Sequence, residues 1–510
     1  MSEITMSPTA IKTVTIVGGG TAGWMAAAVL ARALNNNVEV RLVESEMIGT
    51  VGVGEATIPQ IRLLIHLLGI DEHAFLAATN GTIKLGIEFA NWGRVGERYI
   101  HAFGNLGQSL GMSRFWAYWL RANGTANPSS LWDYSLNAVA AKEDRYEPVE
   151  RIENTQLGGL VRAYHFDAGL FAGYLRQIAE DAGVIRTEGT ISHASQKENG
   201  WLEAVHLENG QSVSGDLFID CSGFRGLLIG QTLDVDYIDW SDWLPCDRAF
   251  AVASDPLSPL PPYTRATAHS AGWQWRIPLQ TRTGNGHVFC SAYTSEDEAR
   301  NTLLEHIVGE LHGEPRLLKF TTGRRARFWD KNCIALGLSA GFMEPLESTS
   351  IHLVQSGISR LLSLFPAHSI NAAEIDAFNR QTTFEYERIR DFLILHYFAN
   401  HRQDSEFWID RANMSIPDSL AAKIDVFKSH GRLFREGDEL FTEPGWLQVL
   451  IGQNILPSGY DPLANQLPDT ELERFLSTLR RVVGGAASRL MPHSDYIERH
   501  CKTAVSRPSS

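Results

Sequence analysis

The chain has 510 residues, of which 44% are hydrophobic and 20% charged, and its formal net charge is −14. This length and composition are sufficient for a large core or for two joined lobes, and they exclude a disordered chain. The acidic balance, without a long run of lysine and arginine, excludes a general electrostatic surface for nucleic acid.

The cysteines and the N-terminus indicate the cellular compartment. The five cysteines are widely separated, and no two form a CxxC pair. This pattern favours reduced thiols over a disulfide framework or a zinc site, so we expect no metal. The first residues are polar up to Val14, which does not fit a signal peptide. No apolar run reaches the ~18 residues of a membrane span, so we expect a soluble, cytoplasmic protein without membrane contact.

The first predicted elements form a strand–turn–helix–strand unit. Residues 13–17 (TVTIV) predict a buried parallel strand, and residues 21–34, rich in alanine and leucine, predict a helix. Residues 38–43 (VEVRLV) predict the next strand, which ends at Glu44. This order is typical of the opening of a doubly wound sheet.

The turn between the first strand and the helix, residues 18–23 (GGGTAG), matches the pattern GxGxxG. In this pattern Gly18 permits the tight turn, Gly20 lets the backbone approach a diphosphate, and Gly23 lets helix and strand pack closely. The diphosphate lies at the helix N-terminus, and a carboxylate after the second strand accepts from ribose hydroxyls. The expected cofactor-binding residues are therefore Gly18, Gly20, Thr21, Ala22, Gly23 and Glu44.

Two later segments distinguish FAD from NAD as the cofactor. Residues 215–223 and 332–341 each predict a strand ending in small residues. Two late strands that return to one nucleotide site resemble the two-domain FAD monooxygenases. No second GxGxxG opens a βαβ unit, so we expect no NAD(P)H domain. A separate flavin reductase, or a nicotinamide cofactor that binds transiently, must then reduce the flavin.

The remaining elements indicate further strands followed by helices. Residues 164–183 predict a helix, and a β-hairpin is expected around the turn at residues 208–210. Residues 251–293 favour strands. Beyond residue 351 the chain is mainly helical, with helices expected at 372–399 and 468–484.

Three further segments are more specific. Residues 272–278 (GWQWRIP) contain the pattern WxWxIP, and residues 339–351 contain EPLEST. Lys84 follows residues 52–59 (GVGEATIP) and lies in an alternating, strand-like stretch. Each also has a simpler interpretation: two tryptophans packed in a core, a helix cap with Glu347 solvated, and a strand lysine whose ammonium lies in water.

In combination these segments resemble the flavin-dependent halogenases of the tryptophan halogenase family. The resemblance implies an enzyme that uses FAD as FADH2, O2, and chloride or bromide to halogenate an electron-rich aromatic substrate through hypohalous acid. It implies that Lys84 carries or orients the halogen and that Glu347 is the catalytic carboxylate. It also implies roles in halide binding for Thr349 and Ser350, in lining the isoalloxazine for Leu338 and Ile351, and in shielding the flavin for Trp273 and Trp275.

One position departs from the family, because many members have glycine where Ser350 stands. Backbone N–H groups in such a turn bind an anion without a cationic side chain, so the local backbone geometry matters for halide binding.

The resemblance also bears on the substrate. His101 and Phe103 match family positions in the aromatic pocket, and Trp446 matches a tryptophan that packs on the indole. Tryptophan-specific members have tyrosines just before this tryptophan, whereas residues 440–445 contain none. This difference favours indole or an indole derivative, as in a broad-substrate indole halogenase subgroup, over free tryptophan.

The expected fold class is α/β, with an FAD-binding doubly wound domain of the Rossmann type, similar to FAD monooxygenases, an additional β-sheet and a largely helical C-terminal region. We assign residues 1–350 to the FAD-binding module with interleaved substrate-site strands and 351–510 to the helical region that completes the substrate pocket. Two alternatives stay open, a hydroxylating flavin monooxygenase and a non-enzymatic flavin-binding redox sensor, although the Lys84 and EPLEST segments argue against both. The sequence leaves homodimer formation open.

Overall fold

The structure is a computed structural model that describes residues 11–35, 37–46, 54–123 and 129–503. The chain divides into two compact units, each built from three segments. Unit 1 comprises Met1–Thr79, Phe166–Asp242 and Phe320–Tyr386, and unit 2 comprises Asn80–His165, Trp243–Lys319 and Glu387–Ser510. The functional division at residue 350 stays a prediction. Gly52 and Val53 of the GVGEATIP segment lie outside the described residues.

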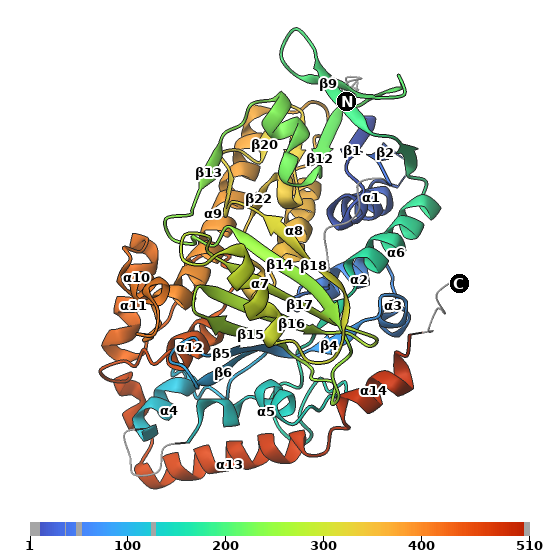
Figure 1. Cartoon of the computed structure of the whole chain (residues 1–510). Coiled ribbons are helices and arrows are strands. Elements are labelled where there is room, and N and C mark those ends of the chain that lie inside the picture. Colours follow the sequence, from blue (N-terminus) through green and yellow to red (C-terminus); the bar gives the residue numbers. More distant parts are fainter. Residues whose placement is uncertain (1–10, 36, 47–53, 124–128, 504–510) are drawn as a thin grey trace, which may run out of the picture. The chain divides into compact units, whose positions relative to one another are not determined.

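Unit 1 contains a six-stranded sheet (Figure 1). Its strands, in spatial order, are β20 (Trp329–Asp330), β21 (Cys333–Ala335), β12 (Leu217–Asp220), β1 (Thr13–Val17), β2 (Glu39–Glu44) and β8 (Ile185–Glu188). β1 pairs in parallel with β2 on one side and with β12 on the other, and β12 pairs in parallel with β21. The carboxyl ends of these four strands therefore share one edge. The doubly wound sheet with two late strands is confirmed.

The elements next to the glycine-rich turn form for local reasons. β1 is built of valine, isoleucine and threonine, and Val14, Thr15 and Ile16 are fully buried, which suits an interior parallel strand. Helix α1 (Thr21–Leu34) buries an alanine-rich stretch and packs on α6 (Ala168–Asp181) and α8 (Ser350–Ser363). Figure 1 shows α1 and α6 beside β1 and β2.

Two predictions in the middle of the chain have different outcomes. The hairpin is confirmed, because β10 (Leu202–Leu207) pairs antiparallel with β11 (Ser212–Ser214). The helix expected over 164–183 begins later, since residues 163–166 form a strand, β7 (Ala163–Phe166). The side chain of Asp167 accepts a hydrogen bond from the Leu170 N–H and so caps α6 at its start, which fixes the boundary.

Further elements complete unit 1. They are α2 (Ile61–Leu67), α3 (Glu72–Ala78), β9 (Ile191–Gln196), which pairs with β10, and a sheet of β13 (Tyr237–Asp239), β19 (Gly323–Arg325) and β22 (Gly341–Phe342). Helix α9 (Ala372–Phe398) contributes residues to both units.

Unit 2 contains a seven-stranded sheet that is antiparallel except where β15 pairs with β5. Its strands, in spatial order, are β18 (Leu311–Lys319), β14 (Arg248–Ser254), β17 (Thr283–Phe289), β16 (Gly272–Pro278), β15 (Thr264–His269), β5 (Gly86–Ala90) and β6 (Arg98–Ala102). The strands expected within 251–293 are thereby confirmed. A shorter strand, β4 (Thr82–Lys84), pairs antiparallel with β7, and Leu85 separates β4 from β5.

Within the described residues, three α-helices that lie entirely in unit 2 precede residue 351, and five follow it in the region predicted to be mainly helical. They are α4 (Phe115–Asn123), α5 (Leu136–Lys142), α7 (Glu296–Glu305), α10 (Glu406–Asn413), α11 (Asp418–His430), α12 (Glu443–Gly452), α13 (Asp469–Ala487) and α14 (His493–His500). The helices expected at 372–399 and 468–484 correspond to α9 and α13.

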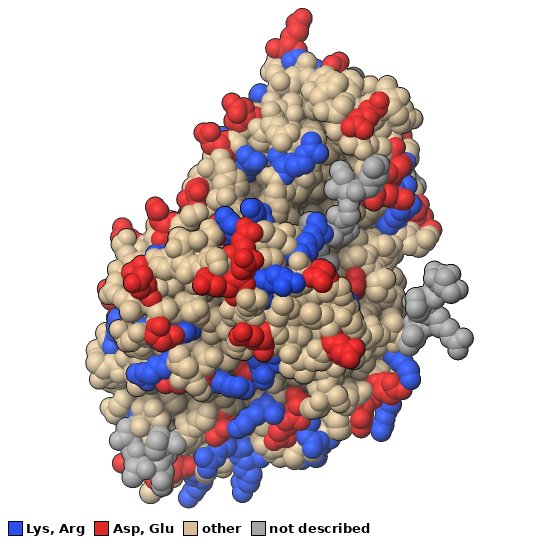
Figure 2. All heavy atoms as spheres, in the orientation of Figure 1, with Lys and Arg blue, Asp and Glu red and all other residues tan. Residues whose placement is uncertain are grey.

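The surface, the helices and the cysteines bear on the expectations about charge, membrane contact and disulfides. On the face shown in Figure 2, acidic and basic side chains are interspersed. Across the residues that the structure describes, every helix is either too short or too polar to cross a bilayer. The five cysteines form no disulfide bond, and four of them are buried.

Candidate active site

The glycine-rich turn follows β1 at the shared strand edge of unit 1. Gly18 has a φ of +111°, which L-residues rarely adopt, and its N–H donates to the Val43 carbonyl at 2.9 Å. A Cβ on Gly23 would lie 1.8 Å from the Gly18 oxygen. A Cβ on Gly20, in contrast, would meet nothing within 4 Å. Gly18 and Gly23 are therefore needed by the fold itself, whereas Gly20 borders open space.

The N-terminus of α1 has the features of an anion site. Gly20 is the N-cap residue, no side chain caps the helix, and its first turn, which begins with Thr21 and Ala22, contains no acidic residue. The first N–H groups of a helix lack intrahelical partners, and the helix dipole favours negative charge there. With the open space at Gly20, this end of α1 fits a diphosphate.

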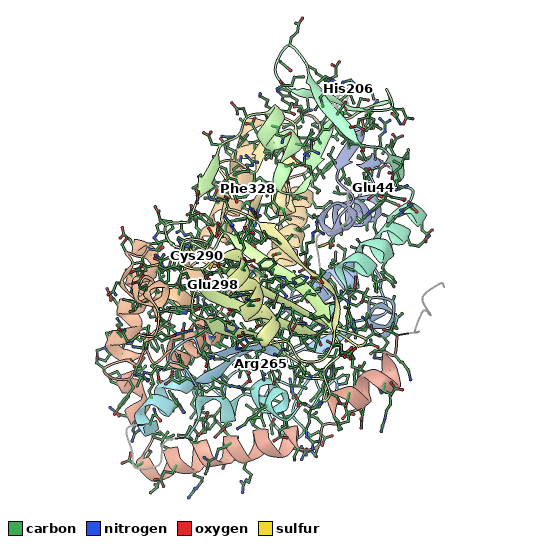
Figure 3. All side chains as sticks on the ribbon, in the orientation of Figure 1. Glu44, His206, Arg265, Cys290, Glu298 and Phe328 are labelled. Carbon is green, nitrogen blue, oxygen red and sulfur yellow. The ribbon has the colours of Figure 1, made fainter. Side chains whose placement is uncertain are left out.

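Glu44 ends β2 against the same turn and lies beside α1 (Figure 3). A Cβ on Gly19 would lie 1.4 Å from the Glu44 Oε2, so only a glycine leaves room for this carboxylate. The other oxygen, Oε1, accepts from the Arg186 Nε at 2.6 Å. Arg186 therefore orients the carboxylate while Oε2 stays on the side of the turn, where it suits a ribose hydroxyl.

The EPLEST segment, residues 344–349, contains a short 3-10 helix, Pro345–Glu347, and ends directly before α8. Ser348 adopts the left-handed conformation with a φ of +58° and makes the sharp turn between them. Glu347 is fully buried and Thr349 is 1% exposed, so the interpretation of Glu347 as a solvated cap residue is wrong. Ser350 begins α8 with a helical backbone, so a serine does not disturb the turn.

The start of α8, like that of α1, lacks a capping side chain. The side chain of its N-cap residue, Thr349, makes no capping bond, and the first turn, which includes Ser350 and Ile351, contains no acidic residue. Leu338 lies in a 3-10 helix, Gly337–Ser339, against which α8 packs. A Cβ on Gly337 would lie 2.9 Å from the Ala22 Cβ, so this segment also contacts α1. Unit 1 thus brings the predicted flavin and halide residues together.

Lys84 lies in unit 2, at the end of β4. Its side chain is fully buried, and its Nζ lies 5.4 Å from the centre of the Phe103 ring, within range of a cation–π contact. The interpretation as a strand lysine with its ammonium in water is therefore wrong. The neighbours Ile83 and Leu85 are fully buried as well. The Phe103 N–H donates to the Leu85 carbonyl at 2.9 Å, which joins the two segments.

His165 lies opposite Thr82 on β7 and was not anticipated from the sequence. The Thr82 Oγ1 donates to the Pro278 carbonyl at 2.7 Å and lies 2.9 Å from the His165 Nδ1. The single hydroxyl proton of Thr82 is used in the bond to Pro278, so the His165 Nδ1 must donate its proton to the Thr82 Oγ1. The His165 Nε2 then has no proton and accepts a hydrogen bond from the Thr264 Oγ1 at 2.9 Å. Burial, and next the nearby Lys84, hold the His165 pKa well below its usual range. His165 is therefore neutral.

Three other histidines of unit 2 are also held neutral. Burial lowers the pKa of His269 to about 3 and the pKa values of His287 and His493 to about 4, against an ordinary value of 6.5. Between pH 6.5 and 4 the unfolded chain thus binds protons that the folded chain does not. The free energy of unfolding therefore decreases as the pH falls through this window.

We expect the His287→Gln variant to show a weaker pH dependence of stability. Removing one such imidazole removes up to about one proton from the difference in proton binding between the unfolded and folded chain. The slope of the unfolding free energy against pH should therefore fall by at most about 1.4 kcal/mol per pH unit. Denaturant unfolding at several pH values between about 7 and 5 measures the slope. An unchanged slope would show that His287 is not held neutral in the folded protein.

The aromatic residues predicted to bind substrate gather in unit 2. The His101 ring centre lies 5.6 Å from that of Phe392 and 6.1 Å from that of Phe441. Phe392 stacks on Phe441 at 3.9 Å and meets Trp446 edge-on at 4.8 Å. The aromatic side chain that precedes Trp446 in this stretch of sequence is thus the apolar Phe441, which packs with it against Phe392.

Helix α12, which contains Trp446, lies against strand β6, which contains His101, because the side-chain amide of Gln448 joins the helix to this strand. The Gln448 Oε1 accepts from the Ala102 N–H, and its Nε2 donates to the Ala102 carbonyl, both at 3.1 Å. A Cβ on Gly445 would lie 2.9 Å from the His101 Nε2, so this glycine permits the close approach.

The tryptophans of the WxWxIP segment lie on β16, inside the seven-stranded sheet. Trp273 is 1% and Trp275 is 8% exposed, and their ring centres are 6.1 Å apart. Trp275 lies opposite Gly286 on β17, where a Cβ would be 2.0 Å from the indole ring. The glycine therefore makes room for the indole. Shielding of flavin by these rings stays a prediction.

The structure thus places the predicted site residues in two groups. Unit 1 holds the glycine-rich turn, Glu44, Leu338 and the EPLEST residues, and unit 2 holds Lys84, the WxWxIP tryptophans and the aromatic residues around Trp446. The sequence did not indicate Phe392, His165 or His493. No local motif marks them, because their contacts join segments far apart in the chain.

Comparison with known proteins identifies the family. The tryptophan halogenase family model matches residues 13–469. The tryptophan 6-halogenase SttH from Streptomyces toxytricini is 37% identical over 439 residues, which cover 81% of this chain and 83% of SttH. A flavin-dependent halogenase from Xanthomonas campestris is 46% identical, with a TM-score of 0.94 over 98% of this chain and 100% of that chain. BrvH, a flavin-dependent halogenase from Brevundimonas sp. BAL3, is 42% identical, with a TM-score of 0.93 over 97% and 100%.

The chain therefore belongs to the tryptophan halogenase family, whose members are flavin-dependent enzymes that halogenate aromatic compounds. The fold expected from the sequence, with an FAD-binding domain of the Rossmann type, is confirmed by the structures that it matches.

Proposed function

We propose that this enzyme uses FADH2, O2 and chloride or bromide to halogenate indole or an indole derivative. The observation that carries the proposal is the fully buried Lys84 beside Phe103, in the unit that also holds the aromatic residues around Trp446. A structural lysine is seldom buried completely, because desolvation of its charge is costly.

Unit 1 is proposed to hold the flavin and the halide. The residues that would hold FAD are Gly18, Gly20, Thr21, Ala22, Gly23, Glu44, Leu338 and Ile351. When bound and reduced, FAD supplies, with O2, the oxidation of halide to hypohalous acid. Thr349 and Ser350 would hold the halide through backbone N–H groups, since the start of α8 has neither a capping side chain nor an acidic residue.

Lys84 is proposed to receive the hypohalous acid and to present the halogen to the substrate. Its amine either donates a hydrogen bond to the acid or forms a haloamine with loss of water. The neutral His165 beside β4 does not compete for protons near neutral pH. His101, Phe103 and Trp446 would orient the aromatic ring, and this orientation determines which carbon reacts. Trp273 and Trp275 would separate flavin from substrate.

Glu347 is proposed as the catalytic carboxylate. Its complete burial suits a group that stabilises positive charge on the ring or accepts the ring proton, because electrostatic interactions are stronger away from water.

The proposal is tested by the supply of reduced flavin. Purified protein with NADH, FAD, bromide and indole should give no brominated product until a flavin reductase or chemically reduced FAD is added, since the sequence has no second GxGxxG unit. Mass spectrometry measures the product. Rapid NADH oxidation by the protein alone would contradict the need for a separate reductase. A hydroxylated product that forms equally with and without bromide would identify a monooxygenase instead.

The aromatic residues around Trp446 also predict a substrate preference. The ammonium and carboxylate groups of tryptophan would lose hydration beside the apolar Phe441, whereas indole carries no such charges. The Lys423 ammonium, 4.9 Å from the centre of the Trp446 ring, is already paired with Glu439 at 2.9 Å. We therefore expect kcat/KM for indole to exceed that for tryptophan at least about tenfold, equivalent to roughly 1.4 kcal/mol. Steady-state kinetics on both compounds checks this ratio, and a clear preference for tryptophan would refute it.

A further inference from the structure

The strand that carries Lys84 is bonded on both edges. On one edge, β4 pairs antiparallel with β7, with Ile83 opposite Tyr164 and Lys84 opposite Ala163. On the other edge, the Ile83 N–H donates to the His493 Nε2 at 3.2 Å, and the Leu85 N–H donates to the Pro262 carbonyl at 2.7 Å. An imidazole from helix α14 thus takes the place of a neighbouring strand.

The two ring nitrogens of His493 have distinct roles. Its Nδ1 lies 2.9 Å from the Leu260 carbonyl oxygen, which can only accept, so Nδ1 carries the proton. The Nε2 then has a lone pair and accepts from Ile83. Both bonds together require the neutral ring. The side chain is fully buried, and the His493 backbone N–H donates to the Asp144 carbonyl at 2.8 Å, which fixes the start of α14.

A second side chain ties the same end of the chain to the residue before β4. The Gln280 Nε2 donates to the Gly81 carbonyl at 2.7 Å and to the Cys501 carbonyl at 2.8 Å. The Gln280 Oε1 accepts from the Thr503 N–H at 2.8 Å. Residues 81–83 are therefore held from outside by α14 and the segment that follows it.

We propose that His493 is a positioning residue for Lys84, and that α14 sets the place of the lysine amine through the backbone of Ile83. The proposal rests on the catalytic role proposed for Lys84. Without His493, the buried Ile83 N–H and Leu260 carbonyl lose their partners, and β4 must shift to find others. A shift of about 1 Å at a reacting group costs about 100-fold in rate.

The test uses two substitutions in the full-length enzyme. His493→Phe keeps a ring of similar size and removes both hydrogen bonds, whereas His493→Asn retains a donor and an acceptor on a shorter side chain. The assay supplies reduced FAD, O2, bromide and indole. It measures FAD affinity, flavin oxidation, brominated indole, and free hypobromous acid captured by a diffusible trap. The control is His287→Gln, which alters a buried histidine whose Nδ1 bonds the Ala299 carbonyl and not β4.

For His493→Phe we expect FAD affinity and flavin oxidation within about twofold of wild type, with kcat for product lowered about 100-fold and KM little changed. Free hypobromous acid should rise correspondingly, because the oxidant is made but not transferred. His493→Asn should recover part of the product yield, and His287→Gln should keep the wild-type yield per flavin oxidised.

Wild-type product yield in a folded His493→Phe variant would overturn the proposal. If His493→Phe does not fold, the test rests on His493→Asn. A wild-type yield of brominated indole in His493→Asn, with a wild-type ratio of brominated indole to free hypobromous acid, would overturn the proposal equally. Lys84→Ala is assayed in parallel. Product formation by Lys84→Ala means that the lysine assignment itself is wrong. Loss of product in Lys84→Ala, with normal yields in both His493 variants, means that only the positioning role is wrong.

Discussion

Lys84→Ala should abolish halogenated product while FAD binding and flavin oxidation by O2 remain near wild type. The residues proposed to hold the flavin belong to unit 1, whereas Lys84 lies on β4 of unit 2. Removal of a positioned catalytic side chain lowers the rate by roughly 100- to 10,000-fold, and we expect a loss in this range. Product is measured by mass spectrometry and flavin oxidation by absorbance, in the same reaction.

Lys84→Met is the matched control for loss of packing. Methionine retains most of the apolar stem that fills the space beside Phe103 but has no amine. If the amine is required for halogen transfer, Lys84→Met should lose halogenated product as completely as Lys84→Ala. Near wild-type product from Lys84→Ala would instead mean that free hypohalous acid reacts with the substrate directly.

Gly20→Val should lose FAD affinity without losing stability. Gly20 has an extended backbone, with a φ of −75° and a ψ of −176°, and a Cβ there meets nothing within 4 Å. The fold therefore has room for a Cβ at this position, and the larger side chain extends into the space proposed for the diphosphate. We expect FAD binding to weaken at least about 100-fold, equivalent to roughly 2.7 kcal/mol. Titration with FAD and denaturant unfolding of the apoprotein measure the two effects separately.

Gly23→Ala provides the contrast on the same turn. Its Cβ would lie 1.8 Å from the Gly18 carbonyl oxygen, so α1 and β1 must move apart. We expect this variant to lose stability as well as FAD affinity. Wild-type FAD affinity in Gly20→Val would refute the placement of the diphosphate at this turn.

Local patterns predicted the strand–turn–helix–strand unit that contains the glycine-rich turn. A glycine-rich turn between a buried strand and an alanine-rich helix has one main structural solution. The structure gives Gly18 a positive φ, Gly23 a close contact with the Gly18 oxygen, and Gly20 open space, whereas binding of a diphosphate there stays a prediction. The order of the strands could not follow from spacing alone. β12 and β21 join the sheet more than 200 residues after β1, and the resemblance to FAD monooxygenases was needed to anticipate this.

The region around Lys84 was harder to predict because its structure depends on distant contacts. A single alternating strand was expected, but Leu85 interrupts it, and its N–H bonds Pro262 instead of a strand partner. Lys84 and Glu347 are both fully buried, although charged side chains in such segments are ordinarily solvated. Only the family motifs pointed to these two residues, since composition and periodicity favour exposed charges at such positions.

The amide of Gln448 has a consequence for association between molecules. β6 is the last strand of its sheet, and an open strand edge is a template on which another chain can extend the sheet. At Ala102 both backbone hydrogen-bonding groups are already occupied by Gln448, so α12 closes that part of the edge. A second copy cannot add a strand there, and the helix that carries Trp446 thereby also protects this part of the edge from edge-to-edge pairing.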